Sequence, residues 1–218
     1  MAGTLVQDKN IVQKVFIASF KAFDLNVNPV FVNSVMGYEK KWAIMKLLES
    51  VTDIQSSKKL ITDIYKIFNQ NMIEYYLAHA KPVASANTIL KKLKSHKLKI
   101  GVNTGFGKDI MNTIISSLNW DDLIDARISS DQVAKGRPHP HMIEYLKMKT
   151  KISSNHEVAK IGDTPSDLLE GNQAQCALNI GIFSKNFPLE ELKKYPHTHI
   201  VPNLNTAVSI ILNNNVTL

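Results

Sequence analysis

Two aspartates, four residues apart, follow an apolar stretch in Lys160-Ile-Gly-Asp-Thr-Pro-Ser-Asp167. The pattern predicts a strand that ends at Asp163 and a helix whose first turn carries Asp167. Carboxylate oxygens suit Mg²⁺, an ion that keeps several waters and needs few protein ligands. The same residues also suit a plain helix start, in which Ser166 or Asp163 caps the helix and Asp167 favours its dipole. Taken alone, the segment leaves both interpretations open.

Two further segments place groups that can bind phosphate after predicted strands. In Val102-Asn-Thr-Gly-Phe-Gly107, Thr104 offers a hydroxyl where a strand stops, beside backbone N–H groups that open a helix. An ordinary strand-to-helix turn would show the same residues. In the segment 131–140, Gly136 and Pro138 hold Arg137 on a stiff loop, where its guanidinium can bind phosphoryl oxygens. The three segments together suggest a phosphate site beside a metal site.

Helices are predicted throughout the first third of the chain. Apolar residues recur there at three- and four-residue steps, the period of a helix with one buried face. The predicted helices cover the stripe from Ile11 to Phe23, the stretch between the cap Asn28 and Gly37, and the ranges Lys40–Glu49 and Ser56–Leu77.

Strands and helices alternate after Pro82. The predicted strands are Leu98–Asn103, Ala126–Ser129, Ala159–Gly162, Leu178–Ile182 and Ile200–Val201; the predicted helices are Ala84–His96, Lys108–Leu118, His141–Met148, Ser166–Gln173 and Thr206–Leu212. Such alternation predicts an α/β fold with a parallel sheet and right-handed crossovers. Ligands bind such sheets at the carboxyl ends of the strands, where we expect the polar segments to meet.

Composition argues against several other classes of protein. Hydrophobic residues make up 44% and charged residues 21% of the 218 residues, as in soluble globular proteins. We expect no membrane segment, because no apolar run approaches the roughly 20 residues that a span needs, and no secretory signal at the start. A single cysteine, Cys176, cannot form an internal disulfide, which favours the cytoplasm. The net charge is +7, but the lysines are dispersed, so we expect no nucleic-acid partner.

Together with Met1-Ala-Gly-Thr at the start, these segments resemble, in order, the motifs of the haloacid dehalogenase superfamily. The resemblance implies a Rossmann-like parallel sheet with helices on both faces, formed by residues 1–8 and 81–218, and an inserted all-helical cap over residues 9–80. Ala2, Met36-Gly-x-x-Lys40, Thr-Gly-Phe and Gly-Arg-Pro resemble its phosphonatase-like branch. That branch implies a hydrolase of small phosphorylated or phosphonylated metabolites, with a possible homodimer through the cap.

The resemblance also implies roles for named residues. Mg²⁺ would be held by the carbonyl of Ala2 and by Asp163, with Asp167 acting directly or through water. The phosphoryl oxygens would be bound by Gly3, Thr4, Thr104, Gly105, Arg137 and Lys40, among which Thr104, Arg137 and Lys40 would take part in catalysis.

In that family an aspartate directly before the Met-Ala-Gly-Thr turn attacks phosphorus, and here it would precede Met1. The chain as written is therefore expected to lack the first strand and to be inactive. A start placed too late or a truncation would explain this, and so would a pseudoenzyme that binds phosphate ligands without turnover.

Lys40 matches the cap lysine with which phosphonoacetaldehyde hydrolase forms a Schiff base. It opens a predicted helix and neighbours Lys41, and both features disfavour the charged amine. Ala43 stands where that enzyme has a histidine, and its early cysteine is unmatched. The alternatives are that Lys40 only binds an anionic substrate or lies in solvent.

Overall fold

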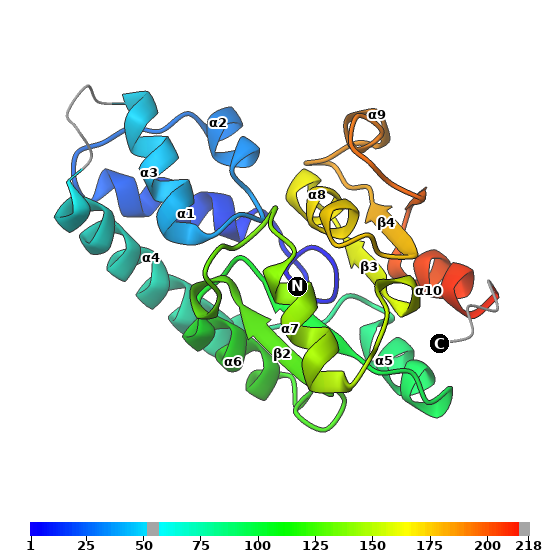
Figure 1. The fold of residues 1–218 in the computed structure, drawn as a ribbon. Helices are drawn as coiled ribbons and strands as arrows, with labels where there is room; N and C mark the ends of the chain where they lie inside the picture. The colour runs from blue at the N-terminus through cyan, green and yellow to red at the C-terminus, as the bar shows by residue number, and fades with distance from the viewer. Residues whose placement is uncertain (52–56, 214–218) are drawn as a thin grey trace.

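Four helices form the first part of the chain in the computed structural model, which describes residues 1–51 and 57–213 (Figure 1). They are α1 (Ile11–Lys21), α2 (Pro29–Ser34), α3 (Lys40–Val51) and α4 (Lys58–His79). α4 packs along α1 and α3, and α2 packs against α1. The four predicted helices are present, and the predicted start of the last, Ser56, lies outside the described residues.

The helical period explains this packing. The predicted stripe on α1 turns Val12, Val15, Phe16 and Phe20 inward, and α4 buries Ile64, Phe68, Met72 and Tyr76 at four-residue steps. The rings of Phe16 and Phe68 meet with their centroids 4.4 Å apart.

The start and end of α2 follow the predicted signals. The Asn28 side chain accepts a hydrogen bond of 2.8 Å from the N–H of Val30, and Pro29 occupies the first turn. Gly37, just past the helix, has a φ of +82°, which a residue with a side chain rarely adopts. The chain therefore turns sharply at Gly37 before α3 begins.

The second part alternates as predicted. Its strands are β1 (Gly101–Thr104), β2 (Ala126–Ser129), β3 (Ala159–Gly162), β4 (Leu178–Ile182) and β5 (His199–Val201); its helices are α5 (Ala86–Ser95), α6 (Lys108–Ser117), α7 (His141–Thr150), α8 (Pro165–Gln173), α9 (Leu189–Leu192) and α10 (Leu204–Asn213). Each pair among the described strands is parallel, which confirms the predicted α/β class. Strand β1 begins at Gly101 rather than at the predicted Leu98, and the short helix α9 was not predicted.

The described strands form two sheets, whereas the expectation was one sheet from which a central strand is missing. β1 pairs with β2, and β3, β4 and β5 form a second sheet in that order. Helices α6 and α7 pack on the first sheet, and α8 and α10 on the second. Side chains join the sheets, since Lys160 on β3 donates a bond of 2.9 Å to Asn103 on β1. Alternation in the sequence sets the direction of each strand but not which strands become neighbours.

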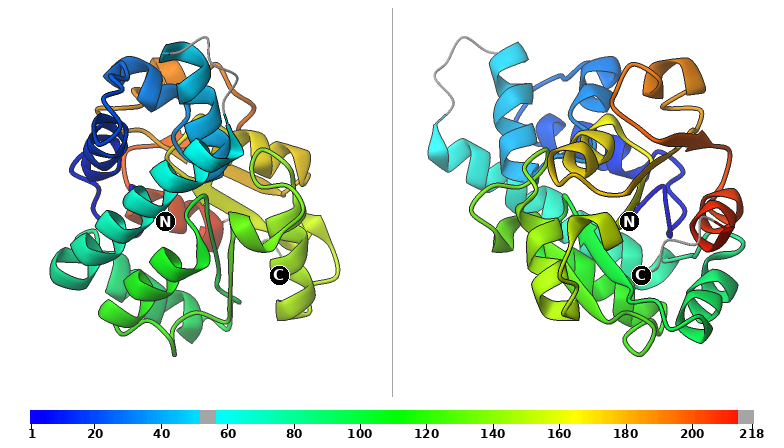
Figure 2. Two further views of the ribbon diagram at one scale, coloured as in Figure 1. Left: turned by 90° about the vertical axis from the view of Figure 1, so that its left-hand side faces the viewer. Right: turned by 45° about the vertical axis from the view of Figure 1, so that its right-hand side comes forward.

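The first residues of the chain lie between these two sheets (Figures 1 and 2). Met1 is buried, and the turn at residues 1–6 is tied to the segment after α4 by a bond from the N–H of Val83 to the carbonyl of Leu5. The division of the chain into a core and a cap at residues 8 and 80 stays a prediction. No helix within residues 1–51 and 57–213 has both the length and the apolar character that crossing a membrane requires.

Candidate active site

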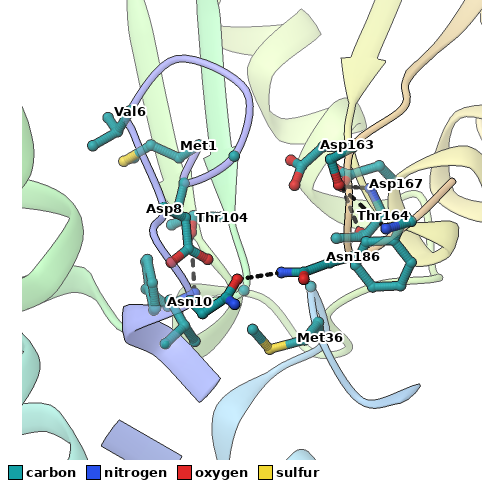
Figure 3. A pocket seen from close by; sticks show the side chains of 18 of the residues that line it. Met1, Val6, Asp8, Asn10, Met36, Thr104, Asp163, Thr164, Asp167 and Asn186 are labelled. Carbon is teal, nitrogen blue, oxygen red and sulfur yellow. Dashed lines mark hydrogen bonds between the residues drawn. The ribbon is translucent and has the colours of Figure 1, made fainter. Parts of the chain in front are cut away.

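A pocket of about 220 Å³ opens where the carboxyl ends of β1 and β3 face the first part of the chain. Figure 3 shows Thr104 and Asp8 on one side of it and Asp163 and Asp167 on the other. The predicted site residues that line it are Ala2, Gly3, Lys40, Thr104, Gly105, Arg137, Asp163 and Asp167. Thr4 touches the site through a hydrogen bond to Asp163. The expected convergence of three chain segments is therefore present, while the roles of these residues stay predictions.

Asp163 follows directly after β3 and leans on the turn at the start of the chain. The hydroxyl of Thr4 donates a bond of 2.6 Å to its Oδ1. A Cβ at Gly3 would lie 1.9 Å from its Oδ2, so only glycine allows the carboxylate to approach the turn so closely. Burial, with the nearby charge of Asp167, raises the pKa of Asp163 to about 6.

Asp167 both caps its helix and faces two cations. Its Oδ2 accepts a bond of 2.6 Å from the hydroxyl of Thr164, which is the N-cap residue of α8. Its Oδ1 lies 3.1 Å from Arg137 and 3.0 Å from Lys160. Burial alone would raise the pKa of this carboxyl, but the two cations hold it well below its ordinary range. The helix-start interpretation is therefore confirmed, with Thr164 as the cap rather than Ser166 or Asp163, while the metal interpretation stays a prediction.

Thr104 and Gly105 form the opposite wall at the end of β1. The buried Thr104 hydroxyl accepts a bond of 3.1 Å from the N–H of Phe106. A Cβ at Gly105 would lie 2.4 Å from the carbonyl oxygens of both Gly37 and Tyr38. The loop between α2 and α3 therefore rests directly on this strand end.

Each of the three nitrogens of the Arg137 guanidinium donates a hydrogen bond to the protein. Nε donates to Glu170 at 2.9 Å, and Nη2 donates to the side chain of Asn103 at 2.6 Å. Nη1 makes a longer bond, 3.3 Å, to the carbonyl of Gly37. The edge that carries Nη1 is thus the one on the side of the pocket wall formed by Gly37.

Lys40 opens α3 and is only 3% exposed, so the alternative that it lies in solvent is wrong. Its Nζ donates a bond of 2.8 Å to the carbonyl of Tyr38. It also lies 5.7 Å and 5.3 Å from the ring centroids of Phe16 and Phe106. Burial lowers the pKa of this amine to about 7, which leaves much of it neutral near neutral pH.

Sequence reasoning missed several residues of the pocket. Asp8, which belongs to none of the motifs above, lines the pocket, where its carboxylate accepts a bond of 2.8 Å from the N–H of Ile11. Burial raises the pKa of Asp8. Asn186, on the loop after β4, donates a bond of 2.7 Å to Asn10 and so joins two walls (Figure 3). No spacing in the sequence relates residues so far apart.

The donor atoms present fit a magnesium ion that keeps most of its water. Within the described parts of the chain, no three histidine, cysteine or acidic side chains cluster as metal ligands. Mg²⁺ needs few protein ligands and prefers hard oxygens, which the carboxylate of Asp163 and the carbonyl of Ala2 supply. Both oxygens of Asp167 are engaged by neighbouring groups, which suits a supporting contact through water rather than direct ligation.

Comparison with known proteins places this geometry in context. The family model described as haloacid dehalogenase-like hydrolase matches residues 1–180. Phosphonoacetaldehyde hydrolase from Bacillus cytotoxicus is 26% identical over 115 residues, which are 52% of this chain and 44% of that protein. The enzyme of the same name from Bacillus thuringiensis is 27% identical over 128 residues, 58% of this chain and 46% of that protein. The matched segments thus span less than half of each relative's length.

Solved structures share the fold across nearly the whole chain. A hydrolase from Pseudomonas syringae has a TM-score of 0.85 at 17% identity and covers 98% of this chain and 94% of its own. A phosphonoacetaldehyde hydrolase-like protein from Oleispira antarctica has a TM-score of 0.84 at 18% identity, covering 99% and 89%. A β-phosphoglucomutase from Clostridium difficile has a TM-score of 0.80 at 15% identity, covering 99% and 94%. Similarity at this level of identity concerns the fold alone.

Proposed function

The chain belongs to the haloacid dehalogenase-like hydrolase family, and on that premise we propose that it is a Mg²⁺-dependent hydrolase of small phosphorylated or phosphonylated metabolites. One observation carries the proposal: Thr104, Arg137 and Asp163, from three separate segments, line one pocket. A hydroxyl and a guanidinium suit phosphoryl oxygens, and a carboxylate beside them suits a divalent cation. A volume of about 220 Å³ favours a small substrate.

In this proposal, separate residues of the chain bind the phosphoryl group and the metal. Thr104 and Arg137 hold the phosphoryl oxygens, while Asp163 and the carbonyl of Ala2 hold Mg²⁺, which supplies positive charge to the transferred group. Asp167 supports the metal and balances the charge of Arg137. In the family pattern, an aspartate directly before the Met-Ala-Gly-Thr turn attacks phosphorus and forms an aspartyl-phosphate that water then hydrolyses.

Turnover tests this proposal when the attacking group is varied. Release of inorganic phosphate from a panel of small phosphate esters and phosphonates is measured with Mg²⁺ and with EDTA. It is measured for the chain as printed, and for the same chain with an aspartate inserted directly before Met1.

Magnesium-dependent release that needs the inserted aspartate and is lost in Asp163→Ala supports the proposal. Equal release by both proteins contradicts the aspartyl-phosphate route. Phosphate binding without turnover by either protein would favour the alternative function, a module that binds phosphate ligands.

Lys40 supports a second candidate, the cleavage of phosphonoacetaldehyde through a Schiff base. The amine lines the pocket and is buried, and its pKa of about 7 provides the neutral form that attacks a carbonyl carbon. Ala2 is neutral where other branches of the family carry an acid, so a proton donor to an ester leaving group must come from elsewhere. An imine avoids that need, because it makes carbon a workable leaving group.

Borohydride trapping separates this candidate from simple ester hydrolysis. The protein is mixed with phosphonoacetaldehyde and reduced, and the adduct is located by mass spectrometry of peptides. The imine route predicts a reduced adduct on Lys40 that disappears in Lys40→Arg and persists in the neighbouring exposed control, Lys41→Arg. Absence of an adduct on Lys40 rules the route out without touching the broader proposal.

A further inference from the structure

A buried glutamate stands behind the pocket, in contact with residues from both sheets. Glu170 lies on α8, three residues after Asp167, and is completely buried. Its carboxylate accepts bonds from Arg137 Nε at 2.9 Å and from Lys160 Nζ at 2.7 Å. The amide of Asn103 adds bonds of 2.9 Å and 3.0 Å to its two oxygens. No sequence motif used above includes this residue.

These contacts close into a network around Arg137. Lys160 donates a hydrogen bond of 2.9 Å to the side chain of Asn103. The same Asn103 side chain accepts a bond of 2.6 Å from Arg137 Nη2, and Lys160 also forms an ion pair of 3.0 Å with Asp167. Two cations and two carboxylates balance. Because the groups are buried and charged, each bond is stronger than its counterpart at the surface.

Two members of the network, Glu170 and Asn103, hold Arg137 from behind the pocket. Arg137 and Asp167 are among the residues that line the pocket, whereas Glu170, Lys160 and Asn103 are not among its described lining residues. Nε is engaged by Glu170, Nη2 by Asn103 and Asp167, and Nη1 reaches toward the carbonyl of Gly37 on the pocket wall. Resting on the function proposed above, we propose that Glu170 is a positioning residue, which fixes the guanidinium so that its Nη1 edge faces the phosphoryl group.

The direction in which Glu170→Gln changes the affinity for phosphate distinguishes a positioning role from a simple effect of charge. Glu170→Gln removes a negative charge near an anion site, which by electrostatics alone should tighten the binding of phosphate. Glutamine also replaces one acceptor oxygen with a donor, so the three donors that face Glu170 can no longer all be satisfied. If Glu170 acts by positioning, affinity for inorganic phosphate should fall about tenfold despite the added positive charge.

Calorimetric titration of the full chain with inorganic phosphate, in the presence of Mg²⁺, measures this affinity. The matched control is Asp121→Asn, which removes the carboxylate partner of the other arginine, Arg127, at an exposed pair of 2.7 Å. The control should bind phosphate as the wild type does. Unchanged or tighter binding by Glu170→Gln would overturn the proposal.

A second pair of variants covers the case in which Glu170→Gln fails to fold. Lys160→Met keeps the pair of Glu170 with Arg137, and the double variant Lys160→Met with Glu170→Met removes a buried ion pair together, a change that folds often tolerate. The double variant should bind phosphate about tenfold more weakly than Lys160→Met. Equal or tighter binding by the double variant would contradict positioning.

NMR of the arginine Nε–H groups measures directly how firmly the guanidinium of Arg137 is held. It also tests the role of Glu170 separately from the proposed function. The chain contains two arginines, Arg127 and Arg137, so the spectrum of their Nε–H groups is simple to assign with Arg127→Lys. In the wild type the Arg137 proton should exchange with water far more slowly than that of the half-buried Arg127, and Glu170→Gln should remove the difference.

A wild type that binds no phosphate would count against the proposed function. Equal exchange at Arg137 in the wild type and in Glu170→Gln would count against the role of Glu170.

Discussion

At the scale of single residues, Lys40 shows how burial sets chemistry. Its pKa in the fold is about 7, below the ordinary value of 10.5, because burial disfavours the charged amine. The cost of charging it in the fold is therefore absent above the ordinary pKa, grows as the pH falls, and is complete below the folded-state pKa. The same burial that supplies a neutral amine thus makes the fold less stable in acid.

Lys40→Met should consequently stabilise the protein, and do so more at about pH 6 than at about pH 9, with a difference on the order of 2 kcal/mol. Urea unfolding at the two pH values measures this difference. Lys41→Met, an exposed neighbour, serves as the control and should change stability little at either pH. An equal effect of Lys40→Met at both values would contradict the assigned pKa shift.

The sequence reveals residues at strand ends better than residues behind them. Asp163 and Thr104 were predicted because each follows an apolar strand and carries a group that binds metal or phosphate. Glu170 was not, because its partner Asn103 is 67 residues away in the chain. Periodicity and local spacing describe neighbours in sequence, and only tertiary packing brings a buried ion network together.

At the scale of elements, the loop between α2 and α3 is locked against the ends of β1 and β3. A Cβ at Gly105 would strike two backbone oxygens, and one at Gly37 would lie 2.1 Å from the hydroxyl oxygen of Ser166. At Gly105 the obstacle is backbone, which cannot move aside as a flexible side chain can. The fit between the helical part and the strand ends thus depends on the missing side chains of two glycines.

Gly105→Ala should push that loop outward, destabilise the protein by about 1–3 kcal/mol and weaken phosphate binding. Urea unfolding and calorimetric titration with phosphate measure the two effects. The control is Gly181→Ala, in β4, whose added Cβ would meet its nearest atoms at an ordinary 3.4 Å. A Gly105→Ala variant as stable as this control would show that the loop is not held against the strand.

The elements themselves were largely predictable. Apolar periodicity and, for α2, the cap residues predicted the described helices of the first part. The alternation after Pro82 predicted five parallel strands, mostly within a few residues of their observed bounds. Alternation alone does not say which strands become neighbours, because strand pairing depends on contacts between distant segments. The four-residue helix α9 is too short to show a period of its own.

At the scale of the whole molecule, ligand binding should raise the stability of the fold. If Asp163 holds Mg²⁺, an ion concentration of 100 times Kd adds about 2.7 kcal/mol. In a chain of this size that corresponds to a rise in Tm of roughly 5–10 °C. Asp163→Asn should lose most of the rise, while Asp122→Asn, at an exposed position, should keep it. Thermal unfolding with and without Mg²⁺ measures this rise in Tm, and a full rise in Asp163→Asn would show that the metal binds elsewhere.

A cytoplasmic location and a homodimer through the cap stay predictions at this scale.

The ion network that joins the sheets also constrains how this protein can diverge. The side chains of four residues each neutralise a buried neighbour: Arg137, Lys160, Asp167 and Glu170. A mutation at one of them therefore leaves an opposite charge buried without a partner. Descendants of this gene should therefore keep all four positions or exchange them in compensating pairs. Substitutions that accumulate one position at a time should be rare at these four positions, whereas the exposed lysines of α5 can change independently.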